Sequence, residues 1–591
     1  MNTYRVFFTR EKKEVTVPEG TTVLEAERMA GLSPDAPCGG AGKCGKCTVK
    51  IHGTVEKACQ IKITADLEVE TIEKESEHRI LVKGAERSVI FHPMLEVLDI
   101  EILPCTVGEN SSDWTRLCEA INSCRKKREG KENAEDSIFQ PKLELLPAIS
   151  RLIKEKNGKA RAIISENQIL CLKEQDNRPV LMAAFDIGTT TVAGYLLDGR
   201  TGEQLSTVSA LNTQTEYGAD VIMRANYSLE HGAEELSTNI RMLLRKLIDT
   251  LCEKTKKDPE DIYQVSVVGN TCMHHLFLGI VPDSLVHAPY NPAISQGLFF
   301  SAERFNLGIH PGGQLIVLPV IAGFVGADTV ACLLAVNLEE EEKMTLMIDI
   351  GTNGEIVLGN KKHRIACSTA AGPAFEGAKI ACGMRGAEGA IEHAQLVEGR
   401  LKYKVIGDGR PTGICGSGLI DLIACLLDAG VIDESGKLVE DSHVVQIDEN
   451  TKAAYLLADS SESGNEKPVY LSQKDIREVQ LAKGAIAAGI ALLTKQMGIT
   501  LEEIEQVYIA GAFGNYMDPK GACRIGMLPG ILKDRIIPVG NAAGEGAKLA
   551  LLNKEELKRA ERLARHTEFL ELAALSEFQD QFVDELEFPE K

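Results

Sequence analysis

The sequence Asp-Ile-Gly-Thr occurs twice in this chain, each time after an apolar stretch typical of a buried strand. The first copy stands in "MAAFDIGTTTVAGYLL" (182–197) and the second in "LMIDIGTNGEIVLG" (346–359). Both patterns predict a strand, a tight turn and a second strand. A single turn of this kind is a common hairpin feature, but two copies in matched surroundings indicate two like units that face one cleft. Such turns direct backbone amides and threonine hydroxyls at phosphate oxygens, while an aspartate holds Mg²⁺ or its waters.

Three more segments extend this pattern, and the order of all five resembles the superfamily of actin, the sugar kinases and the heat-shock chaperones. The two Asp-Ile-Gly-Thr turns resemble its two phosphate motifs. "IAGAFGNY" (509–516) resembles its adenosine motif. "GADTVACLLA" (326–335) and "NAAGEGAKLALL" (541–552) resemble the helices that connect its two lobes.

This resemblance implies a site for ATP with Mg²⁺ between two lobes. Asp186 and Asp349 are expected to position Mg²⁺ or water. Asp328 is expected either to act as the base for the attacking water or to cap its helix. The residues expected to contact the phosphates are Gly188, Thr189, Thr190, Gly351, Thr352 and Asn353. Those expected to contact adenosine are Gly511, Ala512 and Gly514.

A second chemical feature is a cysteine cluster near the start of the chain, in "PCGGAGKCGKCTVKI". Cys38, Cys44, Cys47 and Cys59 follow the spacing C-x5-C-x2-C-x11-C. A plant-type 2Fe–2S site uses a similar C-x4-C-x2-C run with a distant fourth cysteine, whereas structural zinc sites usually use two close cysteine pairs. Glycines let the loop wrap closely around a cluster. The four cysteines are therefore predicted to bind a 2Fe–2S cluster, with zinc as the alternative, inside a ferredoxin-like β-grasp module.

Charge and hydropathy exclude several other classes of protein. The chain carries 65 Lys and Arg against 86 Asp and Glu, a net charge of −21, and nucleic-acid binders are normally basic. No apolar run reaches the roughly 18 residues that span a bilayer, and the N-terminus alternates instead of forming a signal peptide. We therefore expect no nucleic-acid partner, no membrane and a cytoplasmic location, where the sixteen cysteines stay out of disulfides.

With 591 residues, the chain is too long for one core. The predicted fold class is multidomain, mixing α/β and α+β units. Residues 1–95 are expected to form the 2Fe–2S ferredoxin-like domain, 96–180 a linker with a small α+β middle domain, and 181–591 a two-lobed actin-like ATPase. Within the middle unit, "RKKREGKENAEDS" (125–137) has almost no apolar residue and is predicted to be an exposed loop or linker.

Taken together, these motifs resemble the reductive activators of corrinoid proteins, which are ATP-dependent iron–sulfur proteins of anaerobes. Further segments that carry the resemblance are "VVGNTCMHHL", "CSTAAGPAFEG" and "DIREVQLAKGAI". The family implies one-electron transfer from the 2Fe–2S cluster to a corrinoid protein, which restores Co(I) from Co(II) for methyl transfer. It also implies a low-potential electron donor and a homodimer built through the C-terminal domain.

Three other functions remain open from the sequence. An ATP-dependent activator of a radical dehydratase shares the ATPase fold, but its cluster lies between subunits. A non-catalytic electron carrier or regulatory module would not need the two aspartates, and a small-molecule kinase would leave the ferredoxin module idle. His274 and His275 invite a metal site, but their apolar surroundings favour packed or hydrogen-bonded side chains.

Overall fold

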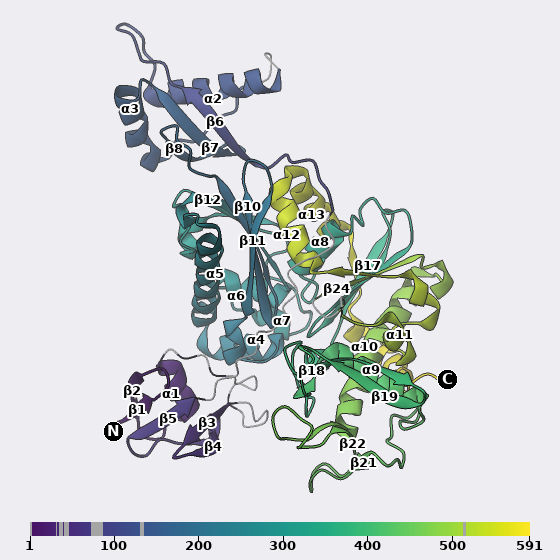
Figure 1. Ribbon diagram of the computed structural model, residues 1–591. Coiled ribbons are helices and arrows are strands. Elements are labelled where there is room, and N and C mark those ends of the chain that lie inside the picture. The colour runs from purple at the N-terminus through teal and green to yellow at the C-terminus, as the bar shows by residue number, and fades with distance from the viewer. Residues whose placement is uncertain are drawn as a thin grey trace.

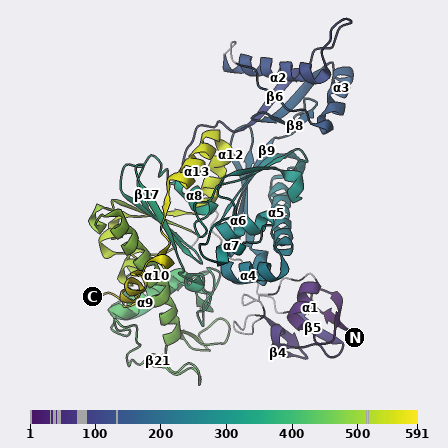
Figure 2. The same cartoon turned by 180° about the vertical axis from the view of Figure 1, so that it is seen from behind.

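The computed structural model describes residues 3–30, 32, 34, 40, 47–71, 87–130, 135–511, 514 and 516–590. Figure 1 shows two small units at opposite ends of a larger body made of two lobes. The unit nearest the N-terminus lies beside the lower end of one lobe, and the other small unit projects from the upper end. Figure 2 shows the same arrangement from behind.

The N-terminal unit, called here the ferredoxin unit (Thr3–Thr71), is a mixed sheet with strand order β2-β1-β5-β3-β4 and one helix. A hairpin joins β1 to β2, and β1 runs parallel to β5. Thr22 and Glu25 form a capping box that starts α1. This topology confirms the predicted β-grasp arrangement. Its elements are β1 (Thr3–Phe8), β2 (Lys13–Pro18), α1 (Val23–Met29), β3 (Thr48–Ile51), β4 (Thr54–Lys57) and β5 (Leu67–Thr71).

The second small unit is an antiparallel sheet, β6-β7-β8, that packs against two helices. The prediction of a loop or linker over 125–137 is wrong for its first five residues, which continue helix α2 to Glu129. Arg125 pairs with Glu96 at 2.8 Å and lies over the ring of Phe139, and Gly130 ends the helix at φ 65°. The elements are β6 (Leu95–Glu101), α2 (Asp113–Glu129), α3 (Leu146–Glu155), β7 (Lys159–Ser165) and β8 (Gln168–Lys173).

The two lobes are built on six-stranded sheets, β11-β10-β9-β12-β14-β13 and, written in the matching direction, β26-β17-β16-β15-β24-β25. In each sheet, three strands that pair antiparallel (β11-β10-β9 and β17-β16-β15) are followed by two parallel strands (β12-β14 and β24-β25), so the repeat seen in the sequence is a structural duplication. The sixth strands differ, because β13 pairs antiparallel with β14 and β26 pairs parallel with β17. In the first lobe the strands are β9 (Leu181–Ile187), β10 (Thr191–Asp198), β11 (Gln204–Leu211), β12 (Ile262–Gly269), β13 (Leu298–Ser301) and β14 (Gln314–Val317). In the second lobe they are β15 (Thr345–Ile350), β16 (Gly354–Gly359), β17 (Arg364–Thr369), β24 (Gln506–Ala510), β25 (Ile536–Gly540) and β26 (Glu568–Phe569).

Two helices connect the lobes, as the sequence predicts: α8 (Ala327–Ala335) and α12 (Ala542–Leu552). One hydrophobic cluster joins residues of both helices to residues of both sheets. The helices touch at Gly546, where an added Cβ would lie 2.0 Å from the carbonyl oxygen of Ala331. The absence of a side chain at that position lets the two backbones pack directly.

The outer helices cover the sheets. On α5 the apolar residues at helical spacing, among them Ile240, Leu244 and Leu247, are buried, and a capping box of Ser472 and Asp475 begins α10. The second lobe also carries two small sheets, β19-β18-β20 and β21-β22-β23. In the described parts of the chain, no helix is both long and apolar enough to span a bilayer. The remaining helices and strands are α4 (Val221–His231), α5 (Glu234–Thr255), α6 (Thr271–Leu278), α7 (Asp283–Val286), β18 (Ala390–Val397), β19 (Arg400–Val405), β20 (Gly413–Ile414), α9 (Gly416–Asp428), β21 (Val444–Val445), β22 (Ala454–Ala458), β23 (Val469–Ser472), α10 (Gln473–Met497), α11 (Pro519–Arg524), α13 (Lys554–His566) and α14 (Phe578–Asp584).

Candidate nucleotide and iron–sulfur sites

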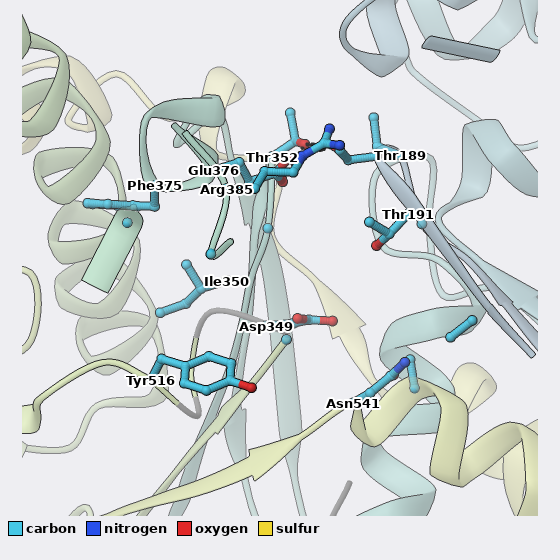
Figure 3. Close-up of a pocket in the computed structure, with 18 of the residues that line it drawn as sticks. Thr189, Thr191, Asp349, Ile350, Thr352, Phe375, Glu376, Arg385, Tyr516 and Asn541 are labelled. Atoms are coloured by element: carbon cyan, nitrogen blue, oxygen red, sulfur yellow. Dashed lines mark hydrogen bonds between the residues drawn. The ribbon is translucent and has the colours of Figure 1, made fainter. Parts of the chain in front are cut away.

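A cavity of about 240 Å³ lies between the lobes, and the turns that follow β9 and β15 both line it. Figure 3 shows Thr352, Glu376 and Arg385 close together at one end and Asp349, Tyr516 and Asn541 toward the other. Of the residues predicted from the sequence, the structure places the following in this wall: Asp186, Gly188, Thr189, Thr190, Asp328, Asp349, Gly351, Thr352, Asn353 and Gly511.

All three backbone carbonyl groups of the first turn, residues 188–190, accept hydrogen bonds from residues outside the turn. Asn212 donates from its backbone amide to Thr190 at 2.9 Å and from its side chain to Gly188 at 2.8 Å. Arg224 donates to the carbonyl of Thr189 at 2.5 Å. Burial lowers the pKa of Arg224 to about 10, so the guanidinium stays charged at neutral pH behind the turn. Because the carbonyl groups are bonded on one side of the turn, the backbone amides remain directed to the other side, where they can bind an anion.

A backbone hydrogen bond also closes the second turn, which is one residue shorter than the first. The Gly351 amide donates to Asn353 at 3.0 Å, as the Gly188 amide does to Thr191 at 2.9 Å. A carboxylate bridges the two turns. Glu376 accepts from the Thr190 hydroxyl at 2.6 Å and from the Thr352 hydroxyl at 2.9 Å. The two threonines therefore face a common anionic group, which is what two phosphate-binding turns require.

Four acidic side chains gather in the same cavity. Asp186 and Asp349 are the second-last residues of β9 and β15, Asp328 lies in the first turn of α8 and Glu355 lies on β16. Burial, with the charge of Asp349 next, raises the pKa of Asp186 to about 7 and that of Asp328 to about 8. Burial alone raises the pKa of Asp349 to about 6, and burial raises the pKa of Glu355 well above its usual range.

The physical cause of these shifts is negative charge held out of water, which a divalent cation would relieve. In the described part of the chain, no three His, Cys, Asp or Glu side chains come close enough to hold a metal ion by themselves. Mg²⁺ commonly uses one or two carboxylates and completes its shell with waters and phosphates. The donor set thus fits Mg²⁺ bound together with a nucleotide.

The predicted adenosine segment is only partly placed. Gly511 lines the cavity at φ 93°, and an added Cβ would lie 2.7 Å from the Ile350 carbonyl oxygen and 2.8 Å from Asp349 Oδ1. Ala512 lies outside the described residues, and Gly514 is not among the described residues that line the cavity. Tyr516 and the ring of Phe375 add flat surfaces to the wall, which suit a base.

Several lining residues escape prediction from the sequence, among them Glu376, Arg385 and Ser417. Two others carry a signal in retrospect. Asn270 follows Gly269 at the end of β12, and Asn541 follows Gly540 at the end of β25. Both cap the next helix, and Asn270 also donates to Thr189 Oγ1 at 2.9 Å. The repeated Gly-Asn pair thus marks two strand ends beside the cavity at which a helix begins, although β12 and β25 are not equivalent strands of the two lobes.

Of the four predicted cluster ligands, the structure describes two, and Cys38 and Cys44 lie outside the described residues. Cys47 precedes β3, and its carbonyl accepts from the Ala58 amide at 2.7 Å, next to Cys59. Burial raises the pKa of the Cys47 thiol, and Cys59 is one of the groups that act on it. A Cβ at Gly40 would lie 3.9 Å from the Cβ of Cys59. Gly40 and two of the four cysteines therefore lie close together.

Duplicated sheets, two connecting helices and a cavity lined by a turn from each lobe define a nucleotide-binding ATPase body, here attached to a β-grasp unit. Family models match consecutive parts of the chain: a 2Fe-2S iron-sulfur cluster binding domain over 6–80, the RACo linker region over 84–178, the RACo middle region over 181–341 and the C-terminal ASKHA domain of RACo over 343–591.

Two of the following three proteins match nearly the whole length of the chain. The chain is 35% identical to the corrinoid activation enzyme RamQ of Eubacterium limosum, covering 98% of each. It is 26% identical to the [Co(II) methylated amine-specific corrinoid protein] reductase of Methanosarcina barkeri, covering 68% of this chain and 76% of that one. The solved structure of a reductive activator for corrinoid, iron-sulfur protein superposes with a TM-score of 0.76 at 33% identity, covering 99% of this chain and 98% of that one. The chain belongs to the family of reductive activators of corrinoid proteins.

Proposed function

We propose that this protein uses ATP to move one electron from a 2Fe–2S cluster to a corrinoid protein, reducing Co(II) to Co(I) for methyl transfer. The observation that carries the proposal is that one full-length match, to RamQ, spans both the iron–sulfur unit and the nucleotide body. The printed names of RamQ and of the Methanosarcina protein describe corrinoid activation and reduction. This favours corrinoid reduction over activation of a radical dehydratase.

The need for ATP follows from reduction potentials. When bound, a plant-type 2Fe–2S cluster supplies a one-electron carrier near about −400 mV, and restoring Co(I) is expected to need a lower potential still. Each 100 mV uphill costs about 2.3 kcal/mol per electron. The cluster alone is therefore an unfavourable donor, and nucleotide binding has to change the state of the complex that receives the electron.

In the iron–sulfur site, Cys38, Cys44, Cys47 and Cys59 are the proposed iron ligands. The contact between the Cys47 and Cys59 segments supports this assignment for two of them. Thiolates are the required form of the ligand, and glycine amides nearby suit hydrogen bonds to cluster sulfurs.

In the nucleotide site, Asp186 and Asp349 are proposed to hold Mg²⁺ or its waters. Asp328 is proposed as the base for the attacking water, since its carboxyl lies in the cavity wall at the first turn of α8, within the site where the water would be activated. The other roles follow the two turns and the glycine segment: phosphate contacts from Gly188, Thr189, Thr190, Gly351, Thr352 and Asn353, and adenosine contacts from Gly511, Ala512 and Gly514.

We also propose the wider setting of the reaction. The chain works as three units, residues 1–95, 96–180 and 181–591. Within the first range, the segment 87–94 is held on the nucleotide body, where Arg87 pairs with Glu556 at 2.7 Å and His92 exchanges backbone hydrogen bonds with Leu552 and Lys554. A low-potential donor reloads the cluster, and the protein acts as a homodimer in the cytoplasm.

The test is an anaerobic reduction assay. The reduced protein is mixed with a Co(II) corrinoid protein, with and without Mg-ATP, and the Co(I) absorption band is followed. Replacing Cys44 by Ala is expected to abolish transfer, and Asp349→Ala is expected to remove only the stimulation by ATP. Equal rate and extent of reduction with and without ATP would refute the proposal.

A further inference from the structure

The segment Asn212–His231, called here the bridge segment, comprises a short 3-10 helix, η3 (Thr213–Glu216), and α4. Its inner side holds the first phosphate turn through the bonds from Asn212 and Arg224 described above. Arg224 is fully buried, and its Nε donates to the Gly218 carbonyl at 2.9 Å. The guanidinium thus ties the loop between η3 and α4 to Thr189. A shift of the turn cannot leave the bridge segment unchanged, because all three turn carbonyls are bonded to it.

The outer side of the same segment receives the ferredoxin unit. Arg28, in the last turn of α1, donates to the carbonyl oxygen of Glu216. The charge of Arg28 also acts on the phenol of Tyr227 on α4, opposing the burial that raises the pKa of that tyrosine to about 12. Figures 1 and 2 both show the ferredoxin unit next to the end of the first lobe that carries α4.

The docking face is rigid because its aromatic side chains are tied together. The rings of Tyr217 and Tyr227 lie 4.9 Å apart, and both phenols donate to Glu235 on α5, at 3.2 and 2.7 Å. Only three residues separate Asn212, which holds the phosphate turn, from Glu216, which receives Arg28. Because this face is rigid and close to the turn, a small displacement of the turn is transmitted to the surface that contacts the ferredoxin unit.

In this conformation the hydroxyls of Thr190 and Thr352 both donate to Glu376. A hydroxyl has one proton to donate, so a phosphate that accepts from these threonines replaces Glu376 as the acceptor. Thr190 is the residue whose carbonyl is bonded to Asn212, so its movement toward a phosphate pulls directly on the bridge segment.

We propose that phosphate binding at the first turn and docking of the ferredoxin unit on the bridge segment oppose each other, so that ATP releases the ferredoxin unit from the first lobe. The proposal rests on the nucleotide site proposed above. Release frees the iron–sulfur unit to approach the corrinoid partner at the moment when ATP is bound. Because linkage is reciprocal, weakening the docking must strengthen nucleotide binding by the factor with which nucleotide weakens docking.

The test uses Arg28→Ala in the cluster-loaded, full-length protein, titrated with Mg-AMP-PNP by isothermal calorimetry under argon. The expected result is a Kd about 5-fold lower than that of the wild type, the low end of typical couplings, since one contact is removed. Arg5→Ala is the matched control. It breaks an exposed ion pair with Asp66, 3.2 Å long, on the same unit, and should leave the Kd unchanged. An unchanged or higher Kd in Arg28→Ala overturns the coupling.

A second measurement needs no variant. Small-angle scattering of the wild type should give a larger radius of gyration with saturating Mg-AMP-PNP than without, and an equal or smaller radius overturns the proposal. These measurements distinguish a failure of the nucleotide site from a failure of the coupling. A wild type that binds no Mg-AMP-PNP refutes the nucleotide site itself, whereas binding with equal Kd values in all three proteins refutes only the coupling.

Discussion

Gly511 is the position at which one added methyl group tests whether Asp349 belongs to the nucleotide site. Gly511→Ala places a Cβ 2.8 Å from Asp349 Oδ1 and 2.7 Å from the Ile350 carbonyl oxygen. Relief of both contacts needs shifts of roughly 0.6 to 1 Å, and a misplacement of about 1 Å in a catalytic group can cost roughly 10²-fold in rate. We therefore expect kcat/KM for ATP hydrolysis to fall about 100-fold, measured as phosphate release with reduced, cluster-loaded protein.

The backbone strain of the substitution has to be separated from the contact with Asp349. Gly511 has φ 93°, and a left-handed conformation costs a non-glycine residue about 1–2 kcal/mol. Gly498, which ends α10 at φ 65°, has no atom within 4 Å of an added Cβ, so Gly498→Ala carries similar strain without the contact. It should lower the melting temperature comparably and leave ATP hydrolysis unchanged. If the Gly511→Ala protein hydrolysed ATP at the wild-type rate, the proposed role of Asp349 in the nucleotide site would be refuted.

Three further substitutions probe the nucleotide body. Gly546→Ala should lower its stability by about 3 kcal/mol, the upper end for overpacking, because the new Cβ meets the Ala331 backbone. Gly530→Ala, with no atom within 4 Å, should melt like the wild type, and equal melting of both variants would refute the close helix contact. Burial lowers the pKa of His274 to about 3, so the unfolded state binds the extra proton between about pH 6.5 and 3, and stability falls as pH falls through that window. His274→Phe should therefore lose about 2 kcal/mol less than the wild type between pH 7 and 5 in urea unfolding; identical losses would contradict the shift. Glu376→Gln should tighten Mg-AMP-PNP binding in calorimetry, because a neutral amide holds the two threonine hydroxyls less strongly; weaker binding would show that the carboxylate assists the nucleotide.

Much of the fold is predictable because its signals are local. Apolar strands that end in glycine turns mark β9 and β15, and the apolar repeat of α5 follows its helical period. The two Asp-Ile-Gly-Thr turns identify the part of the cavity wall that follows β9 and β15, because the end of a strand fixes where the next side chains lie. The adenosine segment is the exception, with Gly511 in the wall and Gly514 outside it.

Other features depend on contacts between distant residues and leave no local pattern. Glu376 lies 186 residues from Thr190, its hydrogen-bond partner. Arg125 belongs to a run whose polarity predicts a loop, yet it is helical because Glu96 and Phe139, from outside the helix, hold its side chain. The bonds from Asn212 and Arg224 to the first turn are likewise invisible until the chain has folded.

The energetics of the reaction demand two separate effects of ATP. A change in the position of the ferredoxin unit alters how fast an electron reaches cobalt, but it leaves the difference in potential between cluster and cobalt untouched. Only a nucleotide-dependent difference in affinity for the Co(II) and Co(I) forms of the corrinoid protein changes how far the reduction proceeds. Loosening the contact of Arg28 with Glu216 should therefore change the rate of Co(I) formation at saturating ATP and leave its final extent as in the wild type. Loss of Asp349 should change both, because it removes the response to the nucleotide. If Arg28→Ala shifted the final Co(I) level, docking of the ferredoxin unit would itself contribute to the affinity for the corrinoid protein. The effects of ATP on the rate and on the extent of reduction could then not be assigned to separate parts of the chain.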